Sequence, residues 1–236
     1  LKKNNSIIIT ELDIFYLSYP KIKKITITGT NGKSTTSKLL YNVLKEHGKD
    51  VRLTGNIGNP ILLERGLKNN TIFVIEASSY QLEYSKHYKS EYSLILNLSP
   101  DHLERHGNYN NYIKAKFKLM QNQSKNNYAF IENRNNLLNN LIKKNKIKSK
   151  IYRVNYKEYQ KYEKLITNHY FKNSSNIKNL SFIFAISKNL KLNFKKIITA
   201  TNKFKALDFR QQVIYKSKKL IIINDSKSTS LSATSP

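Results

Sequence analysis

A short run of residues near the N-terminus has the types and spacing of a phosphate-binding loop. It reads Gly-Thr-Asn-Gly-Lys-Ser at positions 29–34 and directly follows a short β-branched apolar stretch. Glycines let backbone N–H groups approach phosphate oxygens, the lysine adds a positive charge, and the serine hydroxyl can bind Mg²⁺. The standard spacing has a glycine where this chain has Ile27, so the loop is a shorter variant. We predict phosphate binding here; the alternative is an ordinary turn between a strand and a helix.

A carboxylate and a histidine follow two other apolar stretches. Glu76 comes directly after the stretch 72–75, and His102 ends the run Asn-Leu-Ser-Pro-Asp-His after the stretch that begins at Leu94. Catalytic groups of open α/β sheets lie beyond the carboxyl ends of the strands, so Glu76 should face the same crevice as the phosphate loop. There it can complete a Mg²⁺ shell, or it can cap a helix that begins near Ser78. The spacing leaves both roles open.

The run Tyr-Ile-Lys-Ala-Lys at 112–116 lies in a segment of helical periodicity. A single histidine is more often structural than a ligand, and a lysine on a helix is usually solvated. Neither His102 nor these lysines therefore identify a site by themselves.

Alternating apolar runs predict the elements that must position these residues. Short, β-branched or aromatic runs indicate strands, and segments of helical periodicity lie between them. This alternation predicts an α/β fold with a doubly wound, mostly parallel sheet. Residues 155–175 are too polar and aperiodic to assign. The expected strands are 25–28, 72–75, 94–98, 128–131 and 151–154, and the expected helices are 34–47, 109–121, 134–144, 177–190 and 194–203.

Three segments divide the chain. Residues 1–24 indicate the end of an N-terminal domain and a linker, and residues 25–206 form the central domain that carries the phosphate loop. Residues 207–236 indicate the start of a C-terminal domain. In that segment the apolar runs 213–215 and 220–223 flank a Lys-Ser-Lys-Lys turn and predict a hairpin, and only twelve residues follow Asn224, too few for a core.

Composition excludes several classes of site and partner. The 236 residues contain no cysteine, which excludes disulfides and thiolate metal sites. No stretch approaches the ~20 apolar residues of a membrane helix, and the N-terminus lacks a signal peptide's apolar core, so we expect a soluble cytoplasmic protein with no membrane partner. The net charge of +27 comes from scattered lysines. We interpret it as a solvated basic surface that attracts nucleotides, with no nucleic-acid partner.

Five motifs in order resemble those of the Mur ligase family, which includes the folylpolyglutamate synthases. They are GTNGKST, TGNIGNP at 54–60, IEASSYQLE at 75–83, LNLSPDHLERH at 96–106 and YIKAK at 112–116. The segments TGNIG and SSYQLE, and above all Asn-Asp-Ser-Lys-Ser-Thr at 224–229, are similar to the branch that adds D-glutamate. The sister branches carry a different last block, built around Asp with His or Asn. The resemblance covers residues 7–236 and is weakest from 140 to 175.

This resemblance implies an ATP-dependent amide ligase of peptidoglycan precursor synthesis that acts as a monomer. ATP would phosphorylate the alanyl carboxylate of UDP-N-acetylmuramoyl-L-alanine, and the amine of D-glutamate would then displace phosphate from the acyl phosphate. Lys33, Glu76, His102 and Lys116 would be catalytic. The resemblance also implies two Mg²⁺ ions, one bound by Ser34 and Glu76 and one by His102 and Lys116.

An ammonium group cannot bind a cation, so the resemblance implies that Lys116 is carbamylated by CO₂. Helical geometry distinguishes it from Lys114. Positions 112 and 116 are i and i+4 and share a face, whereas 114 lies about 200° away from 112. If Tyr112 packs inward, Lys116 points to the crevice and Lys114 to solvent.

The resemblance implies further contacts to ATP and substrate, for which the alternative is polar surface in loops. The family usually has histidine where this chain has Ser175, and Pro-His where it has Asp-Phe at 208–209. The implied ATP contacts are Gly29, Thr30, Asn31, Gly32, Lys33, Ser34, Thr35, Asn176, Asn179, Arg210 and Asp225, and the implied substrate contacts are Asn56, Ser78, Lys227 and Thr229.

Two other functions remain open. The chain could belong to a sister ligase that uses another amino acid or a folate acceptor, or it could be an inactive nucleotide-binding fragment. The motifs for phosphate chemistry are present, but the domain expected to hold D-glutamate ends soon after Asn224. We therefore expect the 236 residues alone to have no appreciable ligase activity.

Overall fold

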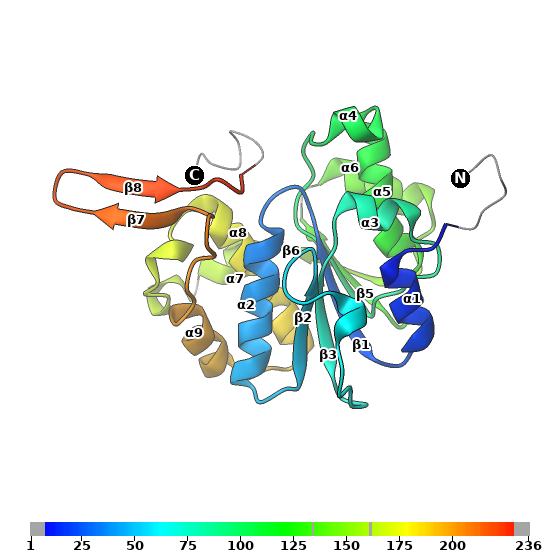
Figure 1. Ribbon diagram of the computed structural model, residues 1–236, viewed down its shortest axis with the longest axis horizontal. Helices are drawn as coiled ribbons and strands as arrows, with labels where there is room; N and C mark the ends of the chain where they lie inside the picture. The colour runs from blue at the N-terminus through cyan, green and yellow to red at the C-terminus, as the bar shows by residue number, and fades with distance from the viewer. Residues whose placement is uncertain (1–7, 134, 161, 229–236) are drawn as a thin grey trace.

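A parallel six-stranded sheet forms the centre of the protein (Figure 1). The structure is a computed structural model that describes residues 8–133, 135–160 and 162–228. The strand order is β2-β3-β1-β4-β5-β6, and every neighbouring pair is parallel. The predicted α/β fold with a doubly wound parallel sheet is therefore confirmed. The strands are β1 (Lys23–Thr28), β2 (Val51–Gly55), β3 (Ile72–Glu76), β4 (Tyr92–Ile95), β5 (Tyr128–Glu132) and β6 (Lys150–Val154).

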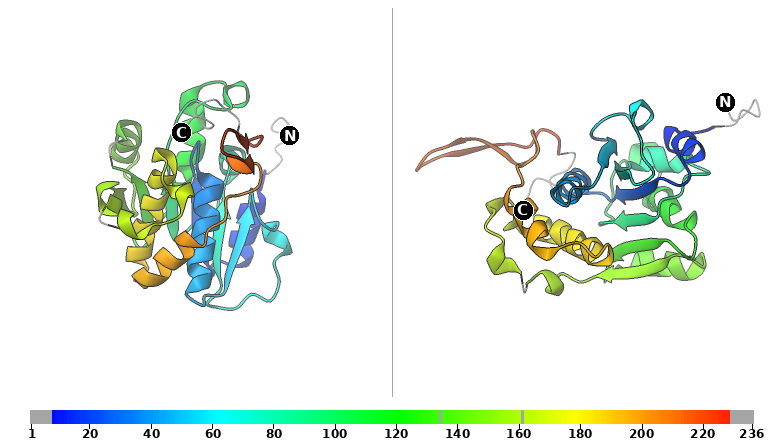
Figure 2. Two further views of the ribbon diagram at one scale, coloured as in Figure 1. Left: turned by 90° about the vertical axis from the view of Figure 1, so that its left-hand side faces the viewer. Right: turned by 90° about the horizontal axis from the view of Figure 1, so that it is seen from below.

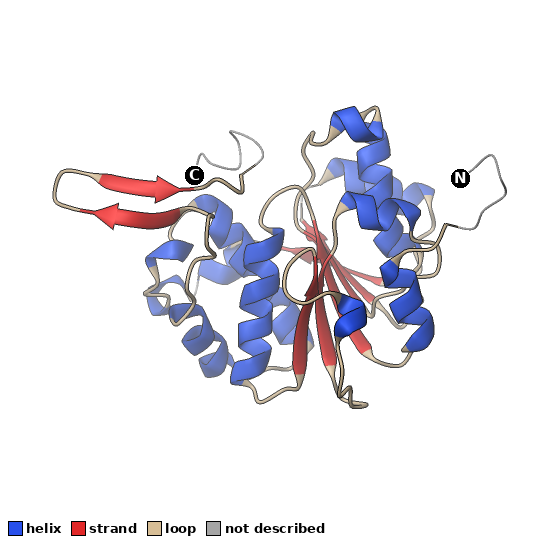
Figure 3. Cartoon of the chain, viewed as in Figure 1, coloured by secondary structure: helices blue, strands red, loops and turns tan. Residues whose placement is uncertain are grey.

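Helices cover both faces of this sheet (Figures 2 and 3). Alternate strand residues point to opposite faces, so Val74 packs under one helical layer while Phe73 and Ile75 pack under the other. The first layer contains α2 (Lys33–Glu46), α8 (Ser174–Asn189) and α9 (Phe194–Asn202). The second contains α1 (Glu11–Ser18), α3 (Ser79–Tyr84), α5 (Tyr109–Gln121) and α6 (Asn136–Lys144), and the short helix α4 (Leu103–His106) packs against α5.

The predicted strands and helices are present with small shifts at their ends, and two differences are informative. Strand β2 was not expected, because its Val-Arg-Leu-Thr-Gly sequence lies at a sheet edge and is only partly apolar. The expected strand 94–98 ends at Ile95. The chain leaves the sheet there because the backbone of residues 97–99 binds the phosphate loop instead.

The described part of segment 155–175, which sequence patterns left unassigned, contains three short helical turns before α8 begins. These are α7 (Lys157–Gln160), η3 (Glu163–Leu165) and η4 (His169–Phe171); a fourth turn, η2 (Ile61–Leu63), follows β2. The segment is folded because Tyr159, Ile166 and Phe171 are buried in the same cluster as α8. Tertiary contacts therefore fix a stretch that has no periodicity of its own.

The N-terminal helix α1 packs directly on the sheet. Leu12 and Phe15 are buried against Phe73 and Ile75. The carboxylate of Asp13 accepts hydrogen bonds from the Ser85 hydroxyl and from the backbone N–H groups of residues 86–88. Burial opposes ionisation of Asp13, but these hydrogen bonds outweigh it and lower its pKa to about 2. The boundary at residue 24 stays a prediction, although the helix before it is part of the same packed unit.

The predicted hairpin is confirmed. Strands β7 (Gln212–Lys216) and β8 (Ile221–Asn224) pair antiparallel and project away from the main sheet (Figure 1). Most of their apolar side chains, such as Ile214 and Ile223, are more than half exposed. That this hairpin begins a separate domain stays a prediction. No helix among the described residues is long and apolar enough to cross a membrane.

Candidate functional site

The phosphate loop connects β1 to α2 at the carboxyl edge of the sheet. Strand β1 lies between β3 and β4, so the loop, Glu76 and the residues after Ile95 all leave the sheet side by side. Gly32 caps α2 in a left-handed conformation with φ of 80°. A Cβ atom there would lie 2.1 Å from the Asn179 side-chain oxygen. Position 32 therefore requires glycine, both because its backbone is left-handed and because the Asn179 side chain leaves no room for a Cβ atom.

Asn97 holds the loop from the neighbouring strand. Its side-chain oxygen accepts from the Asn31 N–H at 2.8 Å, and its side-chain nitrogen donates to the Asn31 carbonyl at 2.9 Å. The Thr30 N–H also donates to the Asn97 carbonyl at 3.0 Å. Sequence analysis placed Asn97 in a motif at a strand end but assigned it no role. The structure shows it as the residue that fixes the loop backbone.

Lys33 folds back over its own loop. Its Nζ donates to the Thr30 carbonyl at 2.7 Å. Burial lowers the pKa of Lys33, and the nearby carboxylate of Glu76 partly opposes this. A phosphate that enters the loop would favour the charged form of Lys33, because its negative charge would act in the same direction as that of Glu76.

Glu76 is fully buried at the end of β3. One carboxylate oxygen accepts from the Asn56 side chain at 3.1 Å, and the other has no hydrogen-bond partner among the described residues. The alternative capping role belongs to Ser78, whose hydroxyl and Gln81 form a capping box at the start of α3. A buried carboxylate oxygen without a hydrogen bond fits a cation that is held between the protein and a nucleotide.

Lys114 and Lys116 of α5 face opposite directions, as predicted. Tyr112 and Lys116 are both buried, whereas Lys114 is exposed. The Lys116 Nζ donates to the Gly29 carbonyl at 2.9 Å and lies 4.7 Å from the centre of the Tyr112 ring. Burial, with the positive charge of Lys33, lowers the pKa of Lys116 well below its usual value. The prediction that Lys116 and Tyr112 share the inward face is confirmed.

His102 lies opposite these groups on the loop before α4. Its backbone is left-handed, with φ of 51°, and its ring lies near the rings of Tyr80 and Tyr112. The ring centre lies 5.1 Å from that of Tyr80, and Nε2 lies 3.5 Å from the Asp101 carboxylate. Sequence analysis did not identify Tyr80 or Asp101. Both lie in motifs used for the resemblance, but neither motif indicates which residues touch the histidine.

A cavity of about 260 Å³ brings most of the predicted residues together. It joins the phosphate loop, the end of β3, the start of α4, the buried face of α5 and the C-terminal segment. The predicted residues in its lining are Thr30, Asn31, Lys33, Asn56, Glu76, Ser78, His102, Lys116, Arg210 and Lys227, and the others are Ser79, Tyr80, Asp101 and Tyr112.

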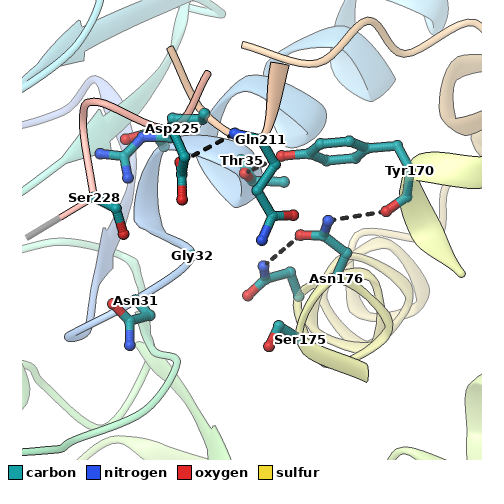
Figure 4. Close-up of a pocket in the computed structure, with 12 residues that line it drawn as sticks. Asn31, Gly32, Thr35, Tyr170, Ser175, Asn176, Gln211, Asp225 and Ser228 are labelled. Atoms are coloured by element: carbon teal, nitrogen blue, oxygen red, sulfur yellow. Dashed lines mark hydrogen bonds between the residues drawn. The ribbon is translucent and has the colours of Figure 1, made fainter. Parts of the chain in front are cut away.

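A second cavity, of about 90 Å³, opens on the other side of the loop (Figure 4). Asn31 and Arg210 line both cavities, so the two lie next to each other. Gly29 lines neither; its carbonyl binds Lys116. Thr229 lies outside the described residues. The predicted residues in the second lining are Asn31, Gly32, Ser34, Thr35, Asn176, Asn179, Arg210 and Asp225, and the others are Tyr170, Ser175, Gln211 and Ser228.

Acidic and histidine side chains do not form a complete metal cage. In the parts of the chain that the structure describes, no three of them converge on one point. Glu76 and His102 line the first cavity, and Ser34 is buried at the start of α2. A cation here would need further oxygen ligands from phosphates and water, as is usual for Mg²⁺ in nucleotide sites.

Comparison with protein families and known sequences gives matches over most of the chain. The Mur ligase middle domain family matches residues 27–202. The UDP-N-acetylmuramoylalanine--D-glutamate ligase of Rickettsia prowazekii (strain Madrid E) is 33% identical over 239 residues, which cover 94% of this chain and 53% of that protein. The protein of the same name from Phenylobacterium zucineum is 46% identical over 112 residues, which cover 48% of this chain and 24% of that protein. The chain thus spans about half the length of the Rickettsia relative.

Solved structures share the fold at low sequence identity. MurF from Acinetobacter baumannii has a TM-score of 0.69 at 16% identity and covers 91% of this chain and 52% of its own. MurF from Thermotoga maritima in complex with ADP has a TM-score of 0.64 at 15% identity and covers 91% of this chain and 56% of its own. These two likenesses show the fold of the central domain.

Proposed function

The chain belongs to the Mur ligase family, and from this premise we propose that it is the ATP-binding part of a ligase that joins D-glutamate to UDP-N-acetylmuramoyl-L-alanine in peptidoglycan precursor synthesis. One observation carries the proposal. One cavity is lined by Lys33, by Lys116 and by the buried carboxylate of Glu76, one oxygen of which has no hydrogen-bond partner among the described residues. The names of the relatives from Rickettsia and Phenylobacterium support D-glutamate as the amino acid.

The nucleotide would bind across both cavities. Its phosphates would meet backbone N–H groups at the start of α2 and the Nζ of Lys33. Its nucleoside would enter the second cavity, beside the amides of Asn176 and Asn179. Asp225 lines that cavity and has a buried carboxylate oxygen with no partner among the described residues, which fits a ribose hydroxyl.

The residues present fit magnesium. Ser34 and Glu76 would hold one ion, and His102 with a carbamylated Lys116 would hold the second. Bound Mg²⁺ would neutralise phosphate charge as it moves between donor and acceptor. Carbamylation needs a neutral amine, which attacks CO₂ and releases a proton. The burial that lowers the Lys116 pKa makes that neutral form accessible.

The side chains of this chain would act mainly by positioning and charge. Asn56, Ser78, Lys227 and Thr229 would orient the UDP-sugar substrate so that an alanyl carboxylate oxygen attacks the γ-phosphorus and ADP leaves. The amine of D-glutamate would then attack the acyl carbon, lose a proton and expel phosphate. Arg210 lines both cavities, so it could contact the phosphates together with Lys33.

Trapping with hydroxylamine tests the first half of this reaction. The chain, Mg-ATP and UDP-N-acetylmuramoyl-L-alanine should give the alanyl hydroxamate together with ADP and phosphate, and Glu76→Gln should not. Hydroxamate from a folate acceptor instead would identify a sister ligase. Nucleotide binding without hydroxamate from either acceptor would identify a nucleotide-binding module.

A chimera tests the second half, because we expect the chain alone to make no amide. This chain would replace the corresponding segment of the Rickettsia prowazekii relative. Phosphate release that depends on D-glutamate should then be restored. A chimera that binds ATP but gives no phosphate release that depends on D-glutamate would contradict the proposed role of this chain in that reaction.

A further inference from the structure

Aromatic rings from three helices lie around His102 in the first cavity. Helices α3 and α4 both pack against α5 (Figure 1). The rings are those of Tyr80 from α3, His106 from α4 and Tyr112 from α5. The His102 ring centre lies 5.1 Å from that of Tyr80 and 6.5 Å from that of Tyr112. Tyr80 is therefore the closer of these two tyrosine rings to the histidine.

Tyr80 is itself held by its neighbours. Its ring stacks on that of His106, with the centres 5.6 Å apart and the planes 13° apart. The Arg105 Cζ lies 5.9 Å from the centre of the same ring, within the range of a cation–π contact. The His106 side chain is only 1% exposed, and its Nε2 lies 3.0 Å from the Ser79 hydroxyl oxygen. A buried and hydrogen-bonded ring thus supports Tyr80, which is itself 37% exposed.

Polar contacts hold the His102 ring only weakly. The residue precedes α4, a helix of four residues, and its backbone is left-handed. The carboxylates of Asp101 and Glu104 lie 3.5 Å and 3.8 Å from its ring nitrogens, which is too long for a good hydrogen bond. The Glu104 side chain is also 76% exposed, so water screens its attraction. The orientation of the His102 ring therefore depends mainly on packing against other rings.

We propose that Tyr80 is a positioning residue, whose ring keeps the His102 imidazole turned toward the part of the first cavity that Lys116 lines. This inference rests on the proposed function, in which His102 and Lys116 hold the second Mg²⁺. A ligand whose ring is already fixed loses less conformational freedom when the ion binds. Groups that orient metal ligands typically change metal affinity about ten- to a hundredfold.

Motion of the His102 ring in the metal-free chain provides the first test. Carbon-13 relaxation of labelled histidine rings measures this motion, and His102→Ala identifies the signal by its loss. Tyr80→Ala should lower the order parameter of the ring, whereas Tyr80→Phe keeps the aromatic face and should match the wild type. Tyr84→Ala is the matched control. It removes another α3 ring that contacts Arg105, and it should leave the motion of His102 unchanged.

Metal binding provides the second test. Electron paramagnetic resonance can follow Mn²⁺ in place of Mg²⁺, with the non-hydrolysable β,γ-imido analogue of ATP present. We expect two ions per chain, and His102→Ala should weaken one of them. Tyr80→Ala should weaken the same ion about tenfold and change the affinities for the other ion and for the nucleotide by less than about twofold. Tyr80→Phe and Tyr84→Ala should bind both ions as the wild type does.

The outcomes that would overturn the inference are distinguishable. Loss of both ions and of the nucleotide in Tyr80→Ala would show that the ring supports the site as a whole. Unchanged affinity for both ions in Tyr80→Ala would show that Tyr80 does not position a metal ligand, whether or not the His102 ring becomes more mobile. A Tyr80→Phe chain that behaves like Tyr80→Ala would assign the effect to the hydroxyl group. If His102→Ala kept both ions, or if the wild-type chain bound fewer than two, the proposed metal role of His102 would be wrong, and the inference with it.

Discussion

The site is assembled from two sides that are held very differently. The phosphate loop is bound by neighbouring elements of the sheet domain: Asn97 from the end of β4 and Lys116 from α5 both bond to its backbone. The C-terminal side supplies Arg210, Asp225 and Lys227 from residues 208–228. Its hydrogen bonds run largely within that segment, from the Gln211 N–H to Asp225 and from the Lys227 N–H to the Phe209 carbonyl.

Backbone conformation shows the same contrast. Phe209 and Gln211, on either side of Arg210, are non-glycine residues with positive φ. Such residues each cost on the order of 1 kcal/mol or more. The loop at 29–34 is held in one conformation by the packed domain, whereas the groups that reach the cavities from the C-terminal side depend on a strained connection. The substitutions below test this contrast, beginning with the largest expected effect.

Replacement of Lys33 by alanine should remove measurable Mg-ATP binding, a loss of about a hundredfold or more because the loop loses its charged contact to phosphate. Calorimetry at modest salt measures it. Lys38→Ala, on the same helix α2, is the control for charge and should bind normally. An unchanged affinity in Lys33→Ala would show that the loop does not bind phosphate.

Lys116→Ala should abolish a carbamate signal that Lys114→Ala keeps. The reason is burial: Lys116 has a lowered pKa and lies in the cavity, whereas Lys114 is exposed. Carbon-13 NMR of the chain with labelled bicarbonate and Mg-ADP detects the carbamate. Raising the pH should strengthen the signal, because the neutral amine reacts and the reaction releases a proton. If the signal disappeared in Lys114→Ala and persisted in Lys116→Ala, Lys114 would carry the carbamate and the prediction would be wrong.

Asn97→Ala should weaken Mg-ATP binding about tenfold, because the Asn31 backbone loses both of its partners and the loop is no longer held in its binding conformation. Asn122→Ala is the matched control. It removes a side-chain bond to the Tyr88 carbonyl, far from the loop, and should lower stability without changing ATP affinity. Equal ATP affinities in the two variants would show that the loop does not need the hydrogen bonds from Asn97.

The part of the site that sequence analysis could predict is the part with a local pattern. The loop at 29–34 follows a buried run, Glu76 ends another, and the faces of Tyr112 and Lys116 follow from the helical repeat. These features depend on residues a few positions apart. The strands and helices were predicted for the same reason.

The residues that analysis missed act across long sequence separations. Asn97 binds a loop 66 residues earlier, and Tyr170 bonds to Thr35 across 135 residues. No periodicity or composition indicates such pairs, because side-chain hydrogen bonds depend on the arrangement of the elements. Segment 155–175 could not be assigned from sequence for a related reason, because its few buried residues have no regular spacing.

The smallest expected effect tests the strained side of the site. Phe209 is left-handed, with φ of 63°, and its ring is 45% exposed beneath the Lys227 ammonium. Phe209→Ala removes the ring but keeps a Cβ in the unfavourable conformation, whereas Phe209→Gly removes both. In most positions alanine is more stable than glycine by about 0.4–1 kcal/mol, because glycine gains freedom in the unfolded chain. Here the order should reverse, with Phe209→Gly more stable than Phe209→Ala by about 1 kcal/mol in urea denaturation. If alanine were as stable as glycine, the left-handed connection would not persist in solution. The contrast between a preorganised loop and a strained C-terminal connection would then be lost.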